Sequence, residues 1–147
     1  MRGFQGAKQV LATAGALDGV ELLDAVATSC LLMAAADGAI APEETRRIAD
    51  ILITLVGTGE NPEVVQSVLD SLARQVTTDH IDSSVAALAT RLREPVQRRK
   101  ALTYAVAVAF ADDRLDAAEE GLLRRLATAF EIGSEEVDAL LKLFRQD

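Results

Sequence analysis

Two nine-residue stretches of this sequence carry the same pattern. The first reads Ala36-Asp37-Gly38-Ala39-Ile40-Ala41-Pro42-Glu43-Glu44, and the second reads Ala111-Asp112-Asp113-Arg114-Leu115-Asp116-Ala117-Ala118-Glu119. Each has an Asp, an aliphatic residue three positions later and a Glu seven positions later, and corresponding residues are 75 positions apart. An internal repeat of this kind limits the folds that the chain can adopt, because the two copies are expected to form the same structural unit.

The residues that follow each stretch continue the repeat as an amphipathic helix. Apolar residues recur there at the spacing i, i+3, i+4, i+7, which places them on one helical face. They are Ile48, Ile51, Leu52 and Leu55 after the first stretch, and Leu123, Leu126, Ala127 and Phe130 after the second. The sequence therefore predicts two copies of a helix–acidic loop–helix unit that pack together as a pseudo-symmetric pair.

Composition favours an all-α fold. Half of the 147 residues are apolar but only 3% are aromatic, so the core has to be built from Ala, Leu, Val and Ile. Ala and Leu favour helices, and the chain has only three prolines to interrupt them. We predict a single compact all-α bundle of about seven helices.

The same patterns divide the chain into segments. Residues 1–17 are expected to be a flexible or weakly helical lead-in, with a partner-binding arm as the alternative, and residues 18–147 a single helical domain. Within it we place repeat one at about 20–58, connecting helices at 62–93, repeat two at about 96–132 and a C-terminal helix at 134–145. Gly133 is expected to end the helix of the second repeat, because glycine readily adopts the left-handed conformation.

Charge, cysteine content and motifs exclude several classes of protein. A net charge of −8 argues against a nucleic-acid-binding surface, which would be basic. One cysteine excludes an internal disulfide framework, and His80 is the only histidine. The sequence has no nucleophile–base constellation and no glycine-rich phosphate loop, so we expect no enzyme. It also has no signal peptide and no apolar run of roughly 18 residues, so a cytoplasmic location is expected.

One basic cluster stands out in this acidic chain. It consists of Arg91, Arg93, Arg98, Arg99 and Lys100, on either side of Pro95. A solvated surface that pairs with nearby carboxylates is one interpretation, and a docking surface for an acidic partner or an anionic membrane is the other. Arg98, Arg99 and Lys100 fall near a predicted helix N-terminus, where the helix dipole disfavours cations.

The acidic bends have two interpretations. Asp-Gly favours a tight turn, and Asp116 with Glu119 has the form of a capping box, so turns and helix caps alone could account for them. However, Asp37 and Asp112 each follow the C-terminus of a helix, where a carboxylate is unfavourable unless an amide or a cation offsets it. Asp and Glu can converge across each loop on a hard divalent cation, although two carboxylates are too few for a tight site. The spacing does not fit an EF-hand, because Ala39 and Ile48 stand where ligands are needed.

The run from Met33 to Glu44, repeated in the second unit and followed by Phe130-Glu131-Ile132-Gly133, resembles the TerB-like (tellurite resistance protein B) family over roughly residues 20–144. The N-terminal region of the DjlA co-chaperones has a similar helical fold. The resemblance implies a pseudo-symmetric all-α domain in the bacterial cytoplasm, with a link to tellurite and other stress resistance. It also implies divalent-metal binding, and by position the ligands would be Asp37, Glu44, Asp112 and Glu119, with Asp116 or Glu43 as helpers. The sequence departs from the family pattern at Ala41 and Asp113.

Two functions are therefore expected from the sequence. The first is a non-enzymatic scaffold that binds Ca²⁺, Mg²⁺ or Mn²⁺ and acts with other stress-response proteins. The second is a plain protein–protein interaction module, for example a homodimer, whose acidic loops only cap helices. A carboxylate-bridged hydrolytic metal centre is the remaining enzymatic alternative.

Overall fold

The computed structural model describes residues 19–35, 42–56, 62–75, 81–111 and 117–145, and these residues form seven α-helices and no strand. The helices are α2 (Gly19–Ala35), α3 (Pro42–Val56), α4 (Pro62–Gln75), α5 (Ile81–Arg91), α6 (Pro95–Ala111), α7 (Ala117–Ala129) and α8 (Ser134–Arg145). The predicted all-α bundle is confirmed. The predicted lead-in and the bends that contain Asp37, Asp112 and Asp116 lie outside the described residues.

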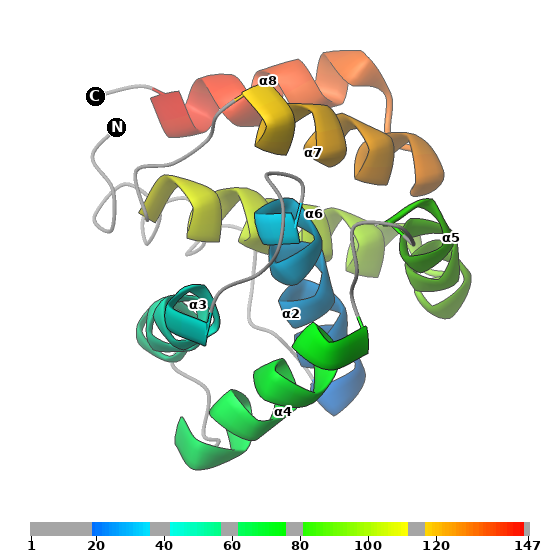
Figure 1. The fold of residues 1–147 in the computed structure, drawn as a ribbon. Coiled ribbons are helices and arrows are strands. Elements are labelled where there is room, and N and C mark those ends of the chain that lie inside the picture. The colour runs from blue at the N-terminus through cyan, green and yellow to red at the C-terminus, as the bar shows by residue number, and fades with distance from the viewer. Residues whose placement is uncertain (1–18, 36–41, 57–61, 76–80, 112–116, 146–147) are drawn as a thin grey trace.

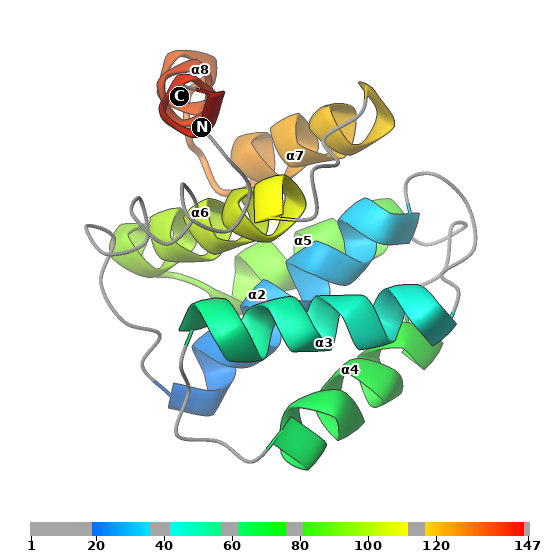
Figure 2. The same cartoon turned by 90° about the vertical axis from the view of Figure 1, so that its left-hand side faces the viewer.

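Two central helices, α2 and α6, organise the bundle. They pack against each other, with α7 and α8 on one side of the molecule and α3 and α4 on the other (Figures 1 and 2). Helix α5 packs against α2 and α7. A helical stretch that is apolar on all sides needs neighbours on all sides, and both central helices contain one, which in α6 runs from Tyr104 to Ala109. Every residue of α2 from Ala25 to Met33 is buried.

The hydroxyl groups inside α2 are accommodated by its own backbone. Thr28 donates to the carbonyl of Asp24 at 2.8 Å, and Ser29 donates to the carbonyl of Ala25 at 2.9 Å. A buried hydroxyl without an acceptor would cost about 1–3 kcal/mol. Because these two are satisfied within the helix, α2 can be enclosed by its neighbours on every side.

The sequence repeat is visible in the arrangement of the helices. Helices α3 and α7 begin at Pro42 and Ala117, which are 75 positions apart. Buried residues of the two central helices also match at this offset; the pairs are Val26 and Ala101, Cys30 and Ala105, Leu31 and Val106, Leu32 and Ala107, and Met33 and Val108. Packing is exchanged between the units, because α2 contacts α7 and α6 contacts α3. Each unit therefore completes the core of the other.

The three prolines mark helix starts. Pro42, Pro62 and Pro95 are the first residues of α3, α4 and α6. Proline suits this position because the missing N–H has no partner within the first turn of a helix.

The end of α7 differs from the sequence prediction. The left-handed residue is Glu131, with φ of 62°, and not Gly133. The amide of Ile132 donates to the carbonyl of Ala127 at 2.8 Å, and the amide of Glu131 donates to the carbonyl of Thr128 at 3.0 Å. This is the Schellman pattern of a helix C-terminus, here made with a non-glycine residue. Gly133 instead lies directly before α8, where its carbonyl accepts the amides of Glu136 and Val137.

Arg98 joins the ends of three helices. It lies in the first turn of α6, and its guanidinium donates to the carbonyls of Leu92 at 2.5 Å, Ala89 at 2.8 Å and Phe130 at 3.3 Å. These carbonyls lie at or just beyond the C-termini of α5 and α7, where a cation is favourable. The electrostatic cost of a cation at the start of α6 is therefore offset by the carbonyls at the C-terminal ends of α5 and α7.

We predict that Arg98→Met lowers the free energy of unfolding by about 2 kcal/mol, because three carbonyls lose a charged donor. The exposed Arg93 provides a matched control, and Arg93→Met should change stability by less than about 0.5 kcal/mol. Urea unfolding followed by circular dichroism measures both variants. Equal effects of the two substitutions would contradict this role of Arg98.

Candidate functional site

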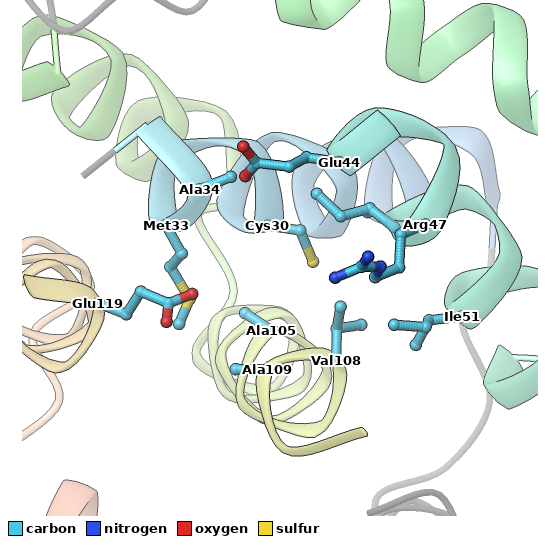
Figure 3. Close-up of a pocket in the computed structure, with 11 residues that line it drawn as sticks. Cys30, Met33, Ala34, Glu44, Arg47, Ile51, Ala105, Val108, Ala109 and Glu119 are labelled. Carbon is cyan, nitrogen blue, oxygen red and sulfur yellow. The ribbon is translucent and has the colours of Figure 1, made fainter. Parts of the chain in front are cut away.

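A cavity of about 100 Å³ lies where the two repeated units meet (Figure 3). Its walls come from four helices, α2 and α3 of the first unit and α6 and α7 of the second. Helix α2 contributes Cys30, Met33 and Ala34, and α6 contributes Ala105, Val108 and Ala109. The two central helices thus form its floor, and the second helix of each unit forms a side wall.

The residues that line the cavity reflect the repeat. Eight of those described form four pairs at the 75-residue offset; the pairs are Cys30 and Ala105, Met33 and Val108, Ala34 and Ala109, and Glu44 and Glu119. Residues related by the repeat meet at one place only near the axis that relates the two units. The cavity therefore lies on the approximate twofold axis of the fold.

Two glutamates from distant parts of the chain share this cavity. Glu44 lies in the first turn of α3 and Glu119 in the first turn of α7, and both side chains are partly buried. The positive end of a helix dipole stabilises a carboxylate at such a position. Figure 3 shows both carboxylates directed toward the end of α2 that carries Met33 and Ala34. The repeat thus places two carboxylates at one cavity.

The cavity departs from symmetry on the α3 side. Its three remaining described residues are Arg47, Ile48 and Ile51, all from α3. Arg47 extends its guanidinium into the cavity, whereas the equivalent residue of α7, Leu122, is buried in the core (Figure 3). The site therefore combines two carboxylates with one cation. Arg47 is not among the predicted site residues, although alignment of the two copies places this arginine opposite the core residue Leu122.

A family model described as "Tellurite resistance protein TerB" matches residues 23–142. The chain belongs to the TerB family. Neither the comparison with curated proteins nor the comparison with solved structures returned a match. The region matched by the TerB model includes every described residue that lines the cavity, so the site lies within the family domain.

The predicted metal ligands of this TerB domain are placed only in part. Glu44 and Glu119 line the cavity, and Glu43 is exposed on α3. Asp37, Asp112 and Asp116 lie outside the described residues. Within the part of the chain that the structure describes, no three His, Cys, Asp or Glu side chains are grouped closely enough to hold a metal ion. Two carboxylates, those of Glu44 and Glu119, are thus what the described helices bring to this place.

The basic cluster of this TerB domain is largely engaged within the molecule. Arg91 pairs with Asp24 at 2.9 Å, and Arg99 makes a two-pronged pair with Glu136 at 2.6 and 3.2 Å. The hydrogen bond from Arg99 lowers the pKa of Glu136. Arg98 is held by three carbonyls. An external partner that bound Arg91, Arg98 or Arg99 would therefore have to displace contacts within the molecule.

No helix among the described residues is both long enough and apolar enough to cross a membrane.

Cys30 faces the cavity from α2 but is chemically inactive in the folded state (Figure 3). Its side chain is buried, and burial raises the pKa of the thiol to about 12. At pH 8 only roughly one thiol in 10⁴ is then ionised, and the thiolate is the reactive form. The cysteine therefore serves as a small apolar residue of the cavity floor.

We predict that Ellman's reagent leaves the native protein unmodified at pH 8 and reacts with one thiol in urea. The raised pKa also has a consequence for stability. Its contribution is fully present below pH 9, the ordinary value, and is lost as pH rises toward about 12, because only the unfolded thiol ionises. Relative to Cys30→Ala, the wild type should lose about 1 kcal/mol between pH 8 and pH 10. A native thiol that reacts as fast as the denatured one would contradict its burial.

Proposed function

We propose that this TerB-family protein is a non-enzymatic helical scaffold that binds a divalent cation at the cavity between its two units. The observation that carries the proposal is that Glu44 and Glu119, related by the repeat, line the same cavity. Ca²⁺, Mg²⁺ and Mn²⁺ prefer oxygen ligands, and carboxylates are the strongest of these in proteins. The net charge of −8 attracts cations to the surface.

The remaining ligands would come from the acidic bends. In the sequence Asp37 stands five positions before the helix of Glu44, and Asp112 and Asp116 stand five positions and one position before that of Glu119. Together with water and loop carbonyls they would bring the site to the six oxygens that Mg²⁺ needs or the six to eight that Ca²⁺ needs. Since Glu44 belongs to the first unit and Glu119 to the second, a bound ion would connect the two halves of the fold.

The family description places the activity in tellurite resistance, and we extend it to this chain as a component of a bacterial, cytoplasmic stress-resistance system. In such a system the protein would act through protein partners and not through catalysis, because the sequence offers no nucleophile–base constellation. The ion would then set the stability and relative position of the two units that partners recognise.

A second candidate function is a protein-interaction module. Between α6 and α8 lies a cavity of about 230 Å³ with an apolar floor that includes Leu102, Ile132 and Leu140. Leu143 at its edge is 49% exposed, and Val96 at the start of α6 is 65% exposed. Exposed large apolar residues beside a groove are a feature of protein-binding surfaces, including those of homodimers.

Thermal unfolding with Ca²⁺, Mg²⁺, Mn²⁺ or EDTA tests the metal proposal. An ion that binds the folded state alone stabilises it by about 2.7 kcal/mol at 100 times its Kd, which raises the melting temperature. The double variant Glu44→Gln and Glu119→Gln should lose most of this increase. Glu135→Gln, an exposed residue in the first turn of α8, should retain it.

Two outcomes would contradict the metal proposal. If millimolar metal leaves the wild-type melting temperature unchanged, the chain does not bind these ions at useful affinity. If the increase survives in the double variant, the ion binds elsewhere.

Sedimentation of the metal-free protein measures its oligomeric state and so tests the second candidate function, the protein-interaction module. A homodimer that forms through the α6–α8 groove should dissociate in Leu143→Asp.

A further inference from the structure

Helices α4 and α8 occupy equivalent places in the two units. Helix α4 packs against α2 and α3, and α8 packs against their counterparts α6 and α7. Buried residues of the two helices also correspond, at an offset of 72 positions; the pairs are Val65 and Val137, and Leu69 and Leu141. Helix α4 therefore serves as an internal reference for what the fold requires of α8.

The outward faces of these two helices differ. The exposed residues Ser67 and Ser71 of α4 correspond to the exposed residues Ala139 and Leu143 of α8. Because two serines are sufficient on α4, packing of the unit does not require apolar residues at these positions. Their presence on α8 therefore indicates a surface that binds a partner.

This surface continues onto α6. Val96 is 65% exposed and lies three and seven positions before Arg99 and Thr103, so these residues share one strip of α6. Arg99 and Thr103 line the α6–α8 groove together with Ala139 and Leu143. The surface formed by these five residues is termed the α6–α8 face. Among the residues that the structure describes, the two exposed large apolar side chains, Val96 and Leu143, both belong to it.

The α6–α8 face has two distinct ends, because its two helices run in the same direction (Figure 1). Arg99 pairs with Glu136 near the start of both helices, and Phe110 stacks on Phe144 near the end of both. One end of the face therefore consists of the first turns of α6 and α8, and the other end lies toward their last turns.

Matching features lie at opposite ends of this face. Val96 and the exposed carboxylate of Glu135 are at the starting end, whereas Leu143 and the exposed amine of Lys142 are at the other. Glu135 stands four positions before Ala139 and Lys142 three positions after it, which puts both on the same side of that residue. A surface of this kind is complementary to itself. A twofold rotation brings each apolar residue to the other and each charge to its opposite, as an isologous interface requires.

We propose that a second copy of this chain binds the α6–α8 face, with the two α8 helices antiparallel across a twofold axis that passes near Ala139. The proposal rests on the second candidate function, the protein-interaction module, and names its partner. Glu135 of each copy faces Lys142 of the other copy. Leu143 of each copy lies over the starting end of the other copy's groove, toward Val96.

Charge reversal, followed by sedimentation of the metal-free protein over a range of concentrations, tests this arrangement. Glu135→Lys and Lys142→Glu should each raise the Kd of the dimer roughly tenfold or more, because each substitution places two like-charged pairs across the interface. An equimolar mixture of the two variants should regain the dimer, since one copy then carries two lysines and the other two glutamates. Glu43→Lys, an equal change of charge in the first turn of α3, should sediment like the wild type.

Cross-linking tests the position of the axis. A residue near a twofold axis meets its own counterpart, so Ala139→Cys should form a disulfide between two copies on mild oxidation. Ser67→Cys places a thiol at the equivalent exposed position of α4 and should form none. Cys30 is buried and does not contribute.

The possible failures are distinguishable. A wild type that remains a monomer at all concentrations overturns the proposal but leaves the groove available to a different protein. A dimer that survives Leu143→Asp overturns both the proposal and the role of the groove. If Leu143→Asp dissociates the dimer but the mixture of charge variants does not regain it, the groove is the interface and the antiparallel arrangement is overturned.

Discussion

The structure depends on covering the stretches of two helices that are apolar on all sides. These are Ala25–Met33 of α2 and Tyr104–Ala109 of α6, and each needs more neighbours than one hairpin can supply. The duplicated arrangement meets this need by exchange, because α2 receives α7 and α6 receives α3 in addition to their own partners. Burial of each Leu or Val in this pair contributes about 1.5–3 kcal/mol, so separation of the two units would expose the best-buried part of the core.

The candidate site is a consequence of that exchange. Since the units meet along α2 and α6, the first turns of α3 and α7 arrive at the same cavity, and the glutamates they carry come with them. A glutamate in the first turn of one helix thus shares a cavity with a glutamate 75 positions away in the sequence. Arg47 breaks the symmetry on one side, so the two halves of the site differ chemically although their backbones are related.

The sequence predicted the fold where local and repeated patterns agreed. The 75-residue offset predicted that α3 and α7 are equivalent, and the apolar spacing predicted their buried faces. The prediction was wrong at Gly133 because the turn after α7 is set by tertiary contacts around Ile132, which is 7% exposed, and Glu131 accepts the left-handed conformation. The role of Arg98 could not be predicted either, since its acceptors are 6, 9 and 32 residues away and meet only in the folded chain.

The two units share one core, so we expect them to unfold together. Native-state hydrogen exchange at increasing urea concentration measures this most directly, because it gives the opening free energy of each amide. We expect amides in the middle of α2 and α6 to exchange only through global unfolding, with the same free energy and the same urea dependence. If the amides of one central helix exchange through a smaller opening while the other stays protected, the two units unfold independently and do not share one cooperative core.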